Sequence, residues 1–316
     1  MKILANDRIS PPGIELLKEA GFEVFTTKVA QEQLINFINE NEIGALLVRS
    51  GTKVRKDLID ACPELKIIGR AGVGTDNIDV DYAQSKGIKV LNTPEAPAGS
   101  VAELVFAHLL GGIRHLYDSN RNMPLEGDSR FKELKKNYSA GTELRGKTLG
   151  IIGLGSIGQE VAKIAIALGM NVIAGSNEEK EVTLTLEFFD GRTTDFQIET
   201  KPLEELFKKS DFISLHVPAQ KEYLIGKNEI EKMKDGVGII NTSRGGIIDE
   251  VALVEALDSG KVAFAALDTF ENEPTPAIKV LMNPHISLSP HIGGSTREAQ
   301  DRIGVALAKK VIEALK

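Results

Sequence analysis

The sequence predicts an α/β protein with two domains, each a doubly wound parallel sheet with helices on both faces. The first observation is the length of 316 residues, which favours two domains at roughly 100–200 residues each. The second is that short apolar runs alternate with amphipathic stretches along most of the chain, as βαβ units require. The third is a Pro- and Gly-rich segment at residues 91–99, which separates two such series.

The first series covers about the first third of the chain. Pro11 and Pro12 open a helix, and Gly21 ends it. The remaining elements expected here are strands at residues 3–5, 22–25, 45–48 and 65–68 and short helices around residues 34–38 and 58–59. Because strands and helices alternate, this domain is expected to be a βαβ series.

The second series begins with a long helix that reaches about residue 113. Ser100 is expected to cap this helix, with Glu103 completing a capping box. Its strands are predicted at residues 148–152, 171–174, 212–216, 238–241, 263–267 and 285–288. A final helix at residues 295–315 is expected to pack on the first series, which makes the first domain discontinuous. The expected domains are therefore residues 1–97 plus 285–316 and residues 98–284.

Residues 181–200 do not fit this alternation. Two stretches of period-two alternation flank Asp190 and Gly191, which supply a turn. The pattern predicts a β-hairpin inserted into the second domain. A surface decoration is the expected role, because loops tolerate insertions.

Composition excludes several classes of protein. The chain has 38 Lys and Arg against 45 Asp and Glu and no basic block, so nucleic acid and anionic membrane surfaces are not expected partners. Cys62 is the single cysteine, which excludes an intrachain disulfide and a thiolate metal cluster. No signal-peptide or membrane-spanning run occurs, so a cytoplasmic protein without a metal site is expected.

A glycine motif follows the first strand of the second domain. Gly153 suits a tight turn, Gly155 allows a pyrophosphate to approach the backbone, and Gly158 allows close packing of helix on strand. The N–H groups of Ser156 and Ile157 then begin a helix whose positive end binds phosphates. This strand, turn and helix predict a Rossmann-like domain that binds a nicotinamide dinucleotide.

The tip of the next strand leaves the choice between NAD and NADP open. An acidic residue usually binds the adenosine ribose at this point, but Ser176 and Asn177 stand here instead. Both side chains can exchange hydrogen bonds with ribose hydroxyls. No Arg follows to attract a 2′-phosphate, and Lys180 is the nearest cation, so NAD is favoured.

Three further segments follow late strands of the second domain, at residues 240–246, 266–274 and 289–294. Together with the glycine motif they resemble the D-2-hydroxyacid dehydrogenase family, and the resemblance covers essentially the whole chain. It implies two Rossmann-like domains, of which the discontinuous substrate-binding domain is flavodoxin-like. Residues 48–54, 69–77 and 146–150 are similar to the D-3-phosphoglycerate dehydrogenases of that family. From the resemblance we expect a short form of these enzymes, without their C-terminal regulatory domain.

The resemblance implies that Arg244, Glu273 and His291 are catalytic. Moving a hydride onto a ketone leaves an alkoxide that needs a proton, and a histidine beside a carboxylate suits that task. An arginine can bind a substrate carboxylate with two hydrogen bonds. The resemblance also implies that the cofactor is contacted by Val217, Thr242, Ser243 and Asp268, the last through the nicotinamide carboxamide. Structural roles are expected for His108, His115 and His285.

The same resemblance implies a small anionic substrate. Arg49 and Lys53 are the expected cations for a phosphate, and Ser50 with the backbone of Val73 and Gly74 is expected near the carboxylate. D-3-phosphoglycerate oxidation, the first step of serine biosynthesis, is the favoured activity. Reduction of glyoxylate or hydroxypyruvate stays open, because Pro97 stands where the phosphoglycerate enzymes usually have Asn.

The resemblance further implies a homodimer, formed through the long helix from Ser100 and an extended, turn-rich arm at residues 118–144. A different class of function on the same fold is an NAD(H)-sensing corepressor or scaffold. Such a protein would bind NADH without turning over any 2-keto acid.

The strand tip at Ser176 generates a first prediction. Without an arginine for the 2′-phosphate, the purified protein is expected to show a higher kcat/KM with NADH than with NADPH. Steady-state rates with one 2-keto acid and both cofactors measure this. A higher value with NADPH would contradict the preference.

Overall fold

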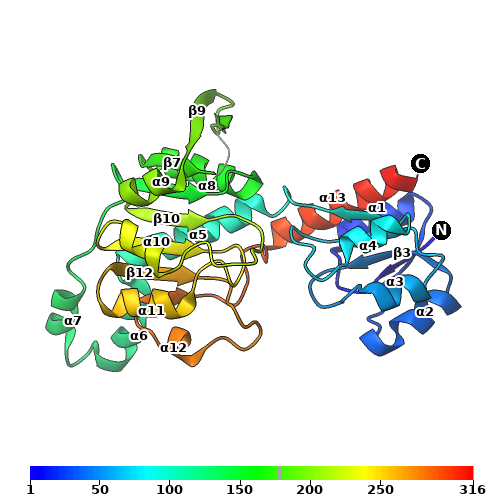
Figure 1. Ribbon diagram of the computed structural model, residues 1–316, viewed down its shortest axis with the longest axis horizontal. Coiled ribbons are helices and arrows are strands. Elements are labelled where there is room, and N and C mark those ends of the chain that lie inside the picture. Colours follow the sequence, from blue (N-terminus) through cyan, green and yellow to red (C-terminus); the bar gives the residue numbers. More distant parts are fainter. Residues whose placement is uncertain (177–179, 316) are drawn as a thin grey trace. The chain divides into compact units, whose positions relative to one another are not determined.

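A computed structural model describes residues 1–176 and 180–315, so Asn177 lies outside the described residues. The chain divides into two compact units, Met1–Ser100 with Gly294–Lys316 (unit 1) and Val101–Gly293 (unit 2), which Figure 1 shows as ribbons. The sequence placed residues 285–293 in the first domain. They lie in unit 2 instead, because β13 (Ile286–Leu288) pairs with β12 (Val262–Leu267).

Unit 1 is built on a parallel sheet, the smaller sheet. Within the described residues its strand order is β2-β1-β3-β4-β5, the flavodoxin-like order. Its strands are β1 (Lys2–Ala5), β2 (Glu23–Phe25), β3 (Ile43–Val48), β4 (Ile67–Arg70) and β5 (Lys89–Asn92). Strand β5 was not predicted, because its short polar sequence runs into the Pro-rich break. It is nevertheless a full edge strand paired with β4.

The helices of unit 1 cover both faces of the smaller sheet. They are α1 (Pro11–Glu19), α2 (Leu34–Glu40), α3 (Lys56–Ala61), α4 (Val80–Ser85) and α13 (Arg297–Leu315). As expected, the last helix returns to unit 1, where Leu307 packs with Leu17 of α1 in one apolar cluster. The two helices approach closely at Gly13, where an added Cβ would lie 2.5 Å from the carbonyl of Gly304.

Unit 2 is built on the larger sheet, whose order within the described residues is β13-β12-β11-β10-β6-β7-β9-β8. The order from β9 to β12 is that of a dinucleotide-binding fold. Its remaining strands are β6 (Thr148–Ile152), β7 (Asn171–Gly175), β8 (Glu181–Glu187), β9 (Thr193–Lys201), β10 (Phe212–Leu215) and β11 (Val237–Asn241). The helices that follow in chain order are α5 (Ala98–Ile113), α6 (Leu116–Glu126), α7 (Phe131–Asn137), α8 (Ser156–Ala167), α9 (Leu203–Lys209), α10 (Lys227–Lys232), α11 (Glu250–Asp258) and α12 (Ile278–Leu281).

Two expected features near the start of unit 2 were wrong. Helix α5 begins at Ala98, so Ser100 lies inside the helix and does not cap it. The helix starts directly after Pro97, where the N–H of Ala98 donates to the carbonyl of Glu95. The arm at residues 118–144 is not extended, because most of it forms α6 and α7.

The hairpin at residues 181–200 is present as the antiparallel pair β8 and β9, and Figure 1 shows β9 projecting from the body of unit 2. It is more than a decoration, because Thr200 and Lys201 of β9 also pair in parallel with β7. Leu184 and Leu186 of β8 are buried. The hairpin therefore completes the edge of the larger sheet.

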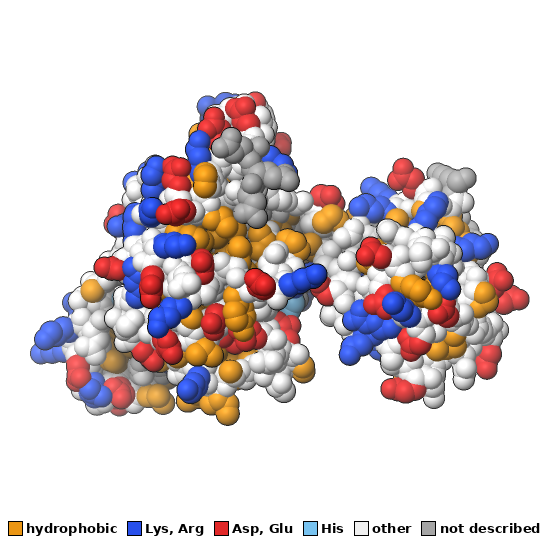
Figure 2. Space-filling view, viewed as in Figure 1, with side chains coloured by type: hydrophobic (Ala, Val, Ile, Leu, Met, Phe, Trp, Pro, Cys, Tyr) orange, Lys and Arg blue, Asp and Glu red, His pale blue; other side chains and the backbone are white. Residues whose placement is uncertain are grey.

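The visible surface carries mixed charge. In the view of Figure 2, basic and acidic side chains are interspersed over the face of each unit, as the near balance of 38 basic and 45 acidic residues suggests. None of the helices in the described ranges is both long enough and apolar enough to cross a membrane.

Candidate active site

The expected site residues of unit 2 stand at one edge of the larger sheet. Apart from β8, the strands of this sheet are parallel, so their carboxyl ends meet at the same edge. The structure places Gly153 and Ser156 after β6, Ser176 after β7, Val217 after β10, Thr242, Ser243 and Arg244 after β11, Asp268 after β12 and His291 after β13. Ligands of doubly wound sheets bind at this edge.

The glycine motif has the geometry that its sequence requires. Gly153 has φ +95°, and a Cβ there would lie 2.5 Å from the carbonyl oxygen of His216. A Cβ at Gly158 would lie 2.1 Å from the carbonyl oxygen of Gly153. Any larger side chain at either position would push helix α8 and strand β10 away from the turn.

The start of helix α8 fits a pyrophosphate. Gly155 precedes the helix and is exposed, and an added Cβ would meet no atom within 4 Å. No side chain caps the helix, and its first turn holds no acidic residue, so the first N–H groups, including those of Ser156 and Ile157, are open to an anion. The residues present therefore fit the phosphates of a dinucleotide.

Three polar atoms at the same edge lack partners within the part of the chain that the structure describes. They are the hydroxyls of Thr242 and Thr269 and the Nδ1 of His216, and all three atoms are buried. Buried polar groups are nearly always hydrogen-bonded. A ligand at this edge would satisfy them, which supports the expectation that Thr242 lines the cofactor site.

His216 was not singled out from the sequence. Its Nε2 lies 2.8 Å from the Ser214 hydroxyl, and its backbone carbonyl packs against Gly153. Burial lowers the pKa of His216 to about 3, because a charged ring is unfavourable in this environment. The ring is therefore neutral beside the glycine turn.

Asn241 shapes the turn that carries Arg244. Its side-chain oxygen accepts from the N–H and the hydroxyl of Ser243, and its amide donates to the carbonyl of Arg244 at 2.8 Å. Asn241 is 2% exposed, so these bonds are made out of water. Sequence patterns gave no sign of this role, since a single buried Asn at a strand end has no periodic signature.

Glu273 and His291 form a close pair. The Nδ1 of His291 lies 2.8 Å from Oε2 of Glu273, and both side chains remain partly exposed. The other carboxylate oxygen of Glu273 accepts the N–H of Phe270 at 3.1 Å, which fixes its orientation. With Nδ1 directed at the carboxylate, Nε2 is the ring nitrogen left to face a substrate.

Asp268 holds the loop that carries His291. This carboxylate is 1% exposed and accepts the N–H of Ile292 and of Gly293, both at 2.8 Å. His291 itself has φ +55°, a left-handed conformation that costs roughly 1–2 kcal/mol for a residue with a Cβ. Such a conformation persists only where its surroundings enforce it. The two residues that follow His291 donate these bonds to Asp268, which constrains the backbone at His291.

Glu250 and Glu271 form a reciprocal pair of hydrogen bonds, here called the acidic clasp, that joins the loops after β11 and β12. The N–H of Glu250 donates to the carboxylate of Glu271, and the N–H of Glu271 donates to the carboxylate of Glu250 at 2.8 Å. Burial raises the pKa of Glu250, and the nearby Glu271 and Glu273 charges raise it further, while the bond from Glu271 opposes this. The clasp ties the chain that follows Arg244 to the chain that leads to Glu273.

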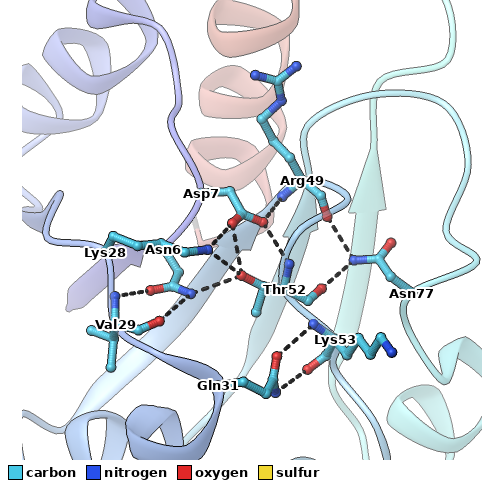
Figure 3. A network of polar contacts seen from close by, with 9 residues as sticks. All are labelled: Asn6, Asp7, Lys28, Val29, Gln31, Arg49, Thr52, Lys53 and Asn77. Atoms are coloured by element: carbon cyan, nitrogen blue, oxygen red, sulfur yellow. Dashed lines mark hydrogen bonds and ion pairs between the residues drawn. The ribbon is translucent and has the colours of Figure 1, made fainter. Parts of the chain in front are cut away.

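The expected substrate residues belong to unit 1. Arg49, Ser50 and Lys53 lie in the loop after β3, and Val73 and Gly74 lie in the turn after β4. Figure 3 shows that buried Asp7 organises the first loop: its carboxylate accepts the N–H of Arg49 at 2.6 Å and both the N–H and the hydroxyl of Thr52.

The charge of Asp7 is balanced by Lys28. Burial raises the pKa of the Asp7 carboxyl, but the hydrogen bonds from Lys28, Arg49 and Thr52 outweigh burial, and the pKa is lowered. Asn77 closes the loop from the other side by donating to the carbonyls of Arg49 and Thr52. In Figure 3 the guanidinium of Arg49 points away from this network.

Asp7, Asn77, Asn241, Glu250 and Glu271 were missed by sequence reasoning. Each acts through a few bonds to backbone atoms. Those of Asn241 stay within its own turn, whereas those of the other four residues reach other segments of the chain. Asp7 and Thr52, for example, are 45 positions apart. Only the position of such residues directly after strands or at helix starts could have signalled them.

Comparison with known proteins shows which family the chain belongs to. Residues 106–293 match the family model described as "D-isomer specific 2-hydroxyacid dehydrogenase, NAD binding domain". A hydroxypyruvate reductase of Thermotoga maritima is 46% identical, with 99% of this chain and 98% of that protein aligned. A D-3-phosphoglycerate dehydrogenase of Methanocaldococcus jannaschii is 40% identical over 100% of this chain, which spans 58% of the length of that relative. The crystal structure of a glyoxylate reductase from Paecilomyes thermophila superposes with a TM-score of 0.82 at 32% identity, covering 100% of this chain and 95% of the other.

The neutral state of His216 generates a prediction about stability. The unfolded chain binds a proton at His216 below a pH near 6.5, whereas the folded chain does so only near pH 3, so this residue makes stability fall as pH falls. Between pH 6.5 and 5.5 the loss is about 1 kcal/mol. Urea unfolding of the wild type and of His216→Gln at both pH values measures it. An equal pH dependence in the two proteins would show that folding leaves the pKa of His216 unchanged, which would contradict its burial as a neutral ring.

Proposed function

Because the chain belongs to the D-isomer specific 2-hydroxyacid dehydrogenase family and carries its NAD-binding domain, we propose that it oxidises D-3-phosphoglycerate to 3-phosphohydroxypyruvate, the first step of serine biosynthesis. A reaction of this class exchanges a hydride between a 2-hydroxy acid and a nicotinamide. A phosphoglycerate dehydrogenase aligned over 100% of this chain supports the choice of substrate.

The observation that carries this choice is the loop of unit 1 after β3. It presents two cations, Arg49 and Lys53, on a backbone fixed by Asp7, Asn77 and Gln31. Neither cation is hydrogen-bonded or ion-paired to another residue in the described ranges. A phosphate brings nearly two negative charges, and an arginine fork matches its oxygens. An ordinary 2-hydroxy acid would need only one cation, for its carboxylate.

Unit 2 would supply the reacting groups. The cofactor, held by the turn after β6 and by the start of α8, accepts the hydride when it is bound. The free Nε2 of His291 would take the hydroxyl proton during oxidation and return it during reduction. Glu273, 2.8 Å from Nδ1, would stabilise the imidazolium that forms. Arg244 would bind the substrate carboxylate and polarise the adjacent carbonyl oxygen.

Asp268 would hold the nicotinamide carboxamide. Its Oδ1 accepts from Ser289 and Ile292, whereas Oδ2 accepts only from Gly293 among the bonds described. A carboxylate oxygen has room for two donors. One position on Oδ2 would therefore suit an amide N–H of the cofactor.

Reduction of hydroxypyruvate is a second candidate. It is supported by the 46% identity to the Thermotoga maritima protein named hydroxypyruvate reductase, which matches this chain over nearly its whole length. Pro97 at the expected hinge points the same way, because it lacks the polar side chain expected of the phosphoglycerate enzymes. Both candidates use the same groups of unit 2 and differ in the phosphate alone.

The proposed enzyme is a homodimer. Helices α6 and α7 expose the apolar side chains of Leu116, Leu125 and Phe131, which are 63%, 76% and 55% exposed. Apolar side chains gathered on two neighbouring helices are typical of a surface that a partner covers. Symmetric pairs are the commonest oligomers.

Substrate choice is tested by three assays on one preparation: NADH formation from D-3-phosphoglycerate, and NADH consumption with hydroxypyruvate and with glyoxylate. The phosphorylated substrate is expected to give the highest kcat/KM. The double variant Arg49→Met, Lys53→Met should raise the KM for D-3-phosphoglycerate by about 10- to 100-fold, because charge-assisted hydrogen bonds are lost. The KM for hydroxypyruvate should change by about 2-fold or less. Equal losses for both substrates would favour the reductase.

The proton transfer is tested at His291. His291→Ala is expected to lower kcat by about 10²-fold or more, the scale of a lost general acid or base. His285→Ala is the matched control, because His285 is exposed before β13 at the opposite edge of the larger sheet. The control should keep kcat within about 2-fold. Near-normal turnover of His291→Ala would remove this residue from the mechanism.

A further inference from the structure

A chain of hydrogen bonds leads from helix α5 to the loop that carries His291. The ring of His108 on α5 lies between two serines of the β13 segment, with Nδ1 at 2.7 Å from the hydroxyl of Ser287 and Nε2 at 2.9 Å from the hydroxyl of Ser289. The hydroxyl of Ser289 continues to Oδ1 of Asp268 at 2.6 Å. His108, Ser289 and Asp268 are 7%, 8% and 1% exposed, so the chain is shielded from water.

The donors in this chain can be assigned. Asp268 also accepts the two backbone N–H groups of Ile292 and Gly293, and a carboxylate oxygen in such a set is an acceptor of hydrogen bonds. The hydroxyl of Ser289 must therefore donate to Asp268, and its oxygen accepts a hydrogen bond from the Nε2–H of His108. Burial lowers the pKa of His108 and the charge of Asp268 opposes this, so the ring is neutral. Its unprotonated Nδ1 then accepts a hydrogen bond from the hydroxyl of Ser287.

We propose that Ser289 and His108 are positioning residues for the dehydrogenase reaction: they orient the carboxylate of Asp268, which in turn fixes the loop that places His291 against Glu273. The proposal rests on the proposed function. Neither residue touches the reacting atoms. Ser289 contributes twice, since its hydroxyl holds Asp268 while its carbonyl accepts the N–H of His291 at 3.1 Å.

The orientation of the Asp268 carboxylate determines the position of the loop that carries His291. The N–H groups of Ile292 and Gly293 bind different oxygens of Asp268, so a rotation of the carboxylate breaks at least one of them. The left-handed backbone at His291 is then no longer enforced. Misplacement of a reacting group by about 1 Å can cost as much as 10²-fold in rate.

Ser287 provides a matched control. It binds the same imidazole as Ser289, lies two positions earlier at the middle of β13, and has no bond to Asp268 among those described. Ser287→Ala and Ser289→Ala each remove one hydroxyl from His108. A purely structural role for the histidine predicts similar effects of both, whereas positioning through Asp268 predicts an effect of Ser289 alone.

The kinetic test compares Ser287→Ala, Ser289→Ala and Ser289→Thr in the full chain. Ser289→Ala is expected to lower kcat by about 10-fold while the KM of the 2-hydroxy acid changes by about 3-fold or less. Ser287→Ala should keep kcat within about 2-fold, and Ser289→Thr, which retains a hydroxyl, should recover most of the loss. Equal losses in the two alanine variants, or a normal kcat in Ser289→Ala, would overturn the proposal.

A spectroscopic test does not depend on activity. Nitrogen NMR of the ring is expected to show the Nε2–H tautomer of His108, and the Cε1–H resonance of His291 is expected to shift in Ser289→Ala but not in Ser287→Ala. An Nδ1–H tautomer, or an unmoved His291 resonance in Ser289→Ala, would overturn the proposal even in an inactive protein. Absence of turnover with all 2-hydroxy and 2-keto acids would instead reject the proposed function.

Discussion

A parallel sheet with both faces buried restricts the positions at which charged and polar side chains can lie. In each unit the strands are lined by apolar side chains, and the helices above and below them exclude water. The charged groups of the candidate site therefore stand at or near the strand ends, where the chain leaves the sheet. The expected site residues of both units lie after such ends, and the clasps and networks that shape them lie there as well.

In both units a buried aspartate after one strand holds the loop that follows the neighbouring strand. In unit 1, Asp7 follows β1 and accepts N–H groups from the loop after the neighbouring strand β3. In unit 2, Asp268 follows β12 and accepts N–H groups from the loop after the neighbouring strand β13. Each buried carboxylate joins two adjacent strand ends, because several backbone donors compensate its loss of water.

The carboxylates differ in how their charge is balanced. Asp7 forms an ion pair with Lys28. Asp268 instead accepts a hydrogen bond from the hydroxyl of Ser289, which is itself hydrogen-bonded to the neutral ring of His108. A cation beside Asp268 would weaken its attraction for an amide of a bound cofactor. The neutral His108 supplies direction without charge, which suits a group placed between a cofactor and a catalytic loop.

Sequence patterns predicted correctly those features that depend on residues close together in the chain. The three glycines of the nucleotide turn and the alternation of strands and helices gave the fold class, and the structure confirms it. Strand β5 was missed and the start of α5 was misplaced, because Pro and Gly near residue 94 resemble a break in any local window. Asp7 and Ser289 were missed, since their partners are brought together only by the three-dimensional arrangement of strands that are distant in sequence. Asn241 was missed because its bonds within its own turn leave no periodic pattern in the sequence.

The hairpin at the sheet edge has a consequence for the order of folding. Strand β9 lies between β7 and β8, so β8 occupies the outermost place although it precedes β9 in the chain. Among the described strands, β8 pairs only with β9. During synthesis β8 is therefore made before its partner, and its backbone N–H and C=O groups stay unpaired until β9 forms. The alternate threonines and glutamates of β8 keep this temporarily open strand hydrated and discourage its pairing with a neighbouring nascent chain.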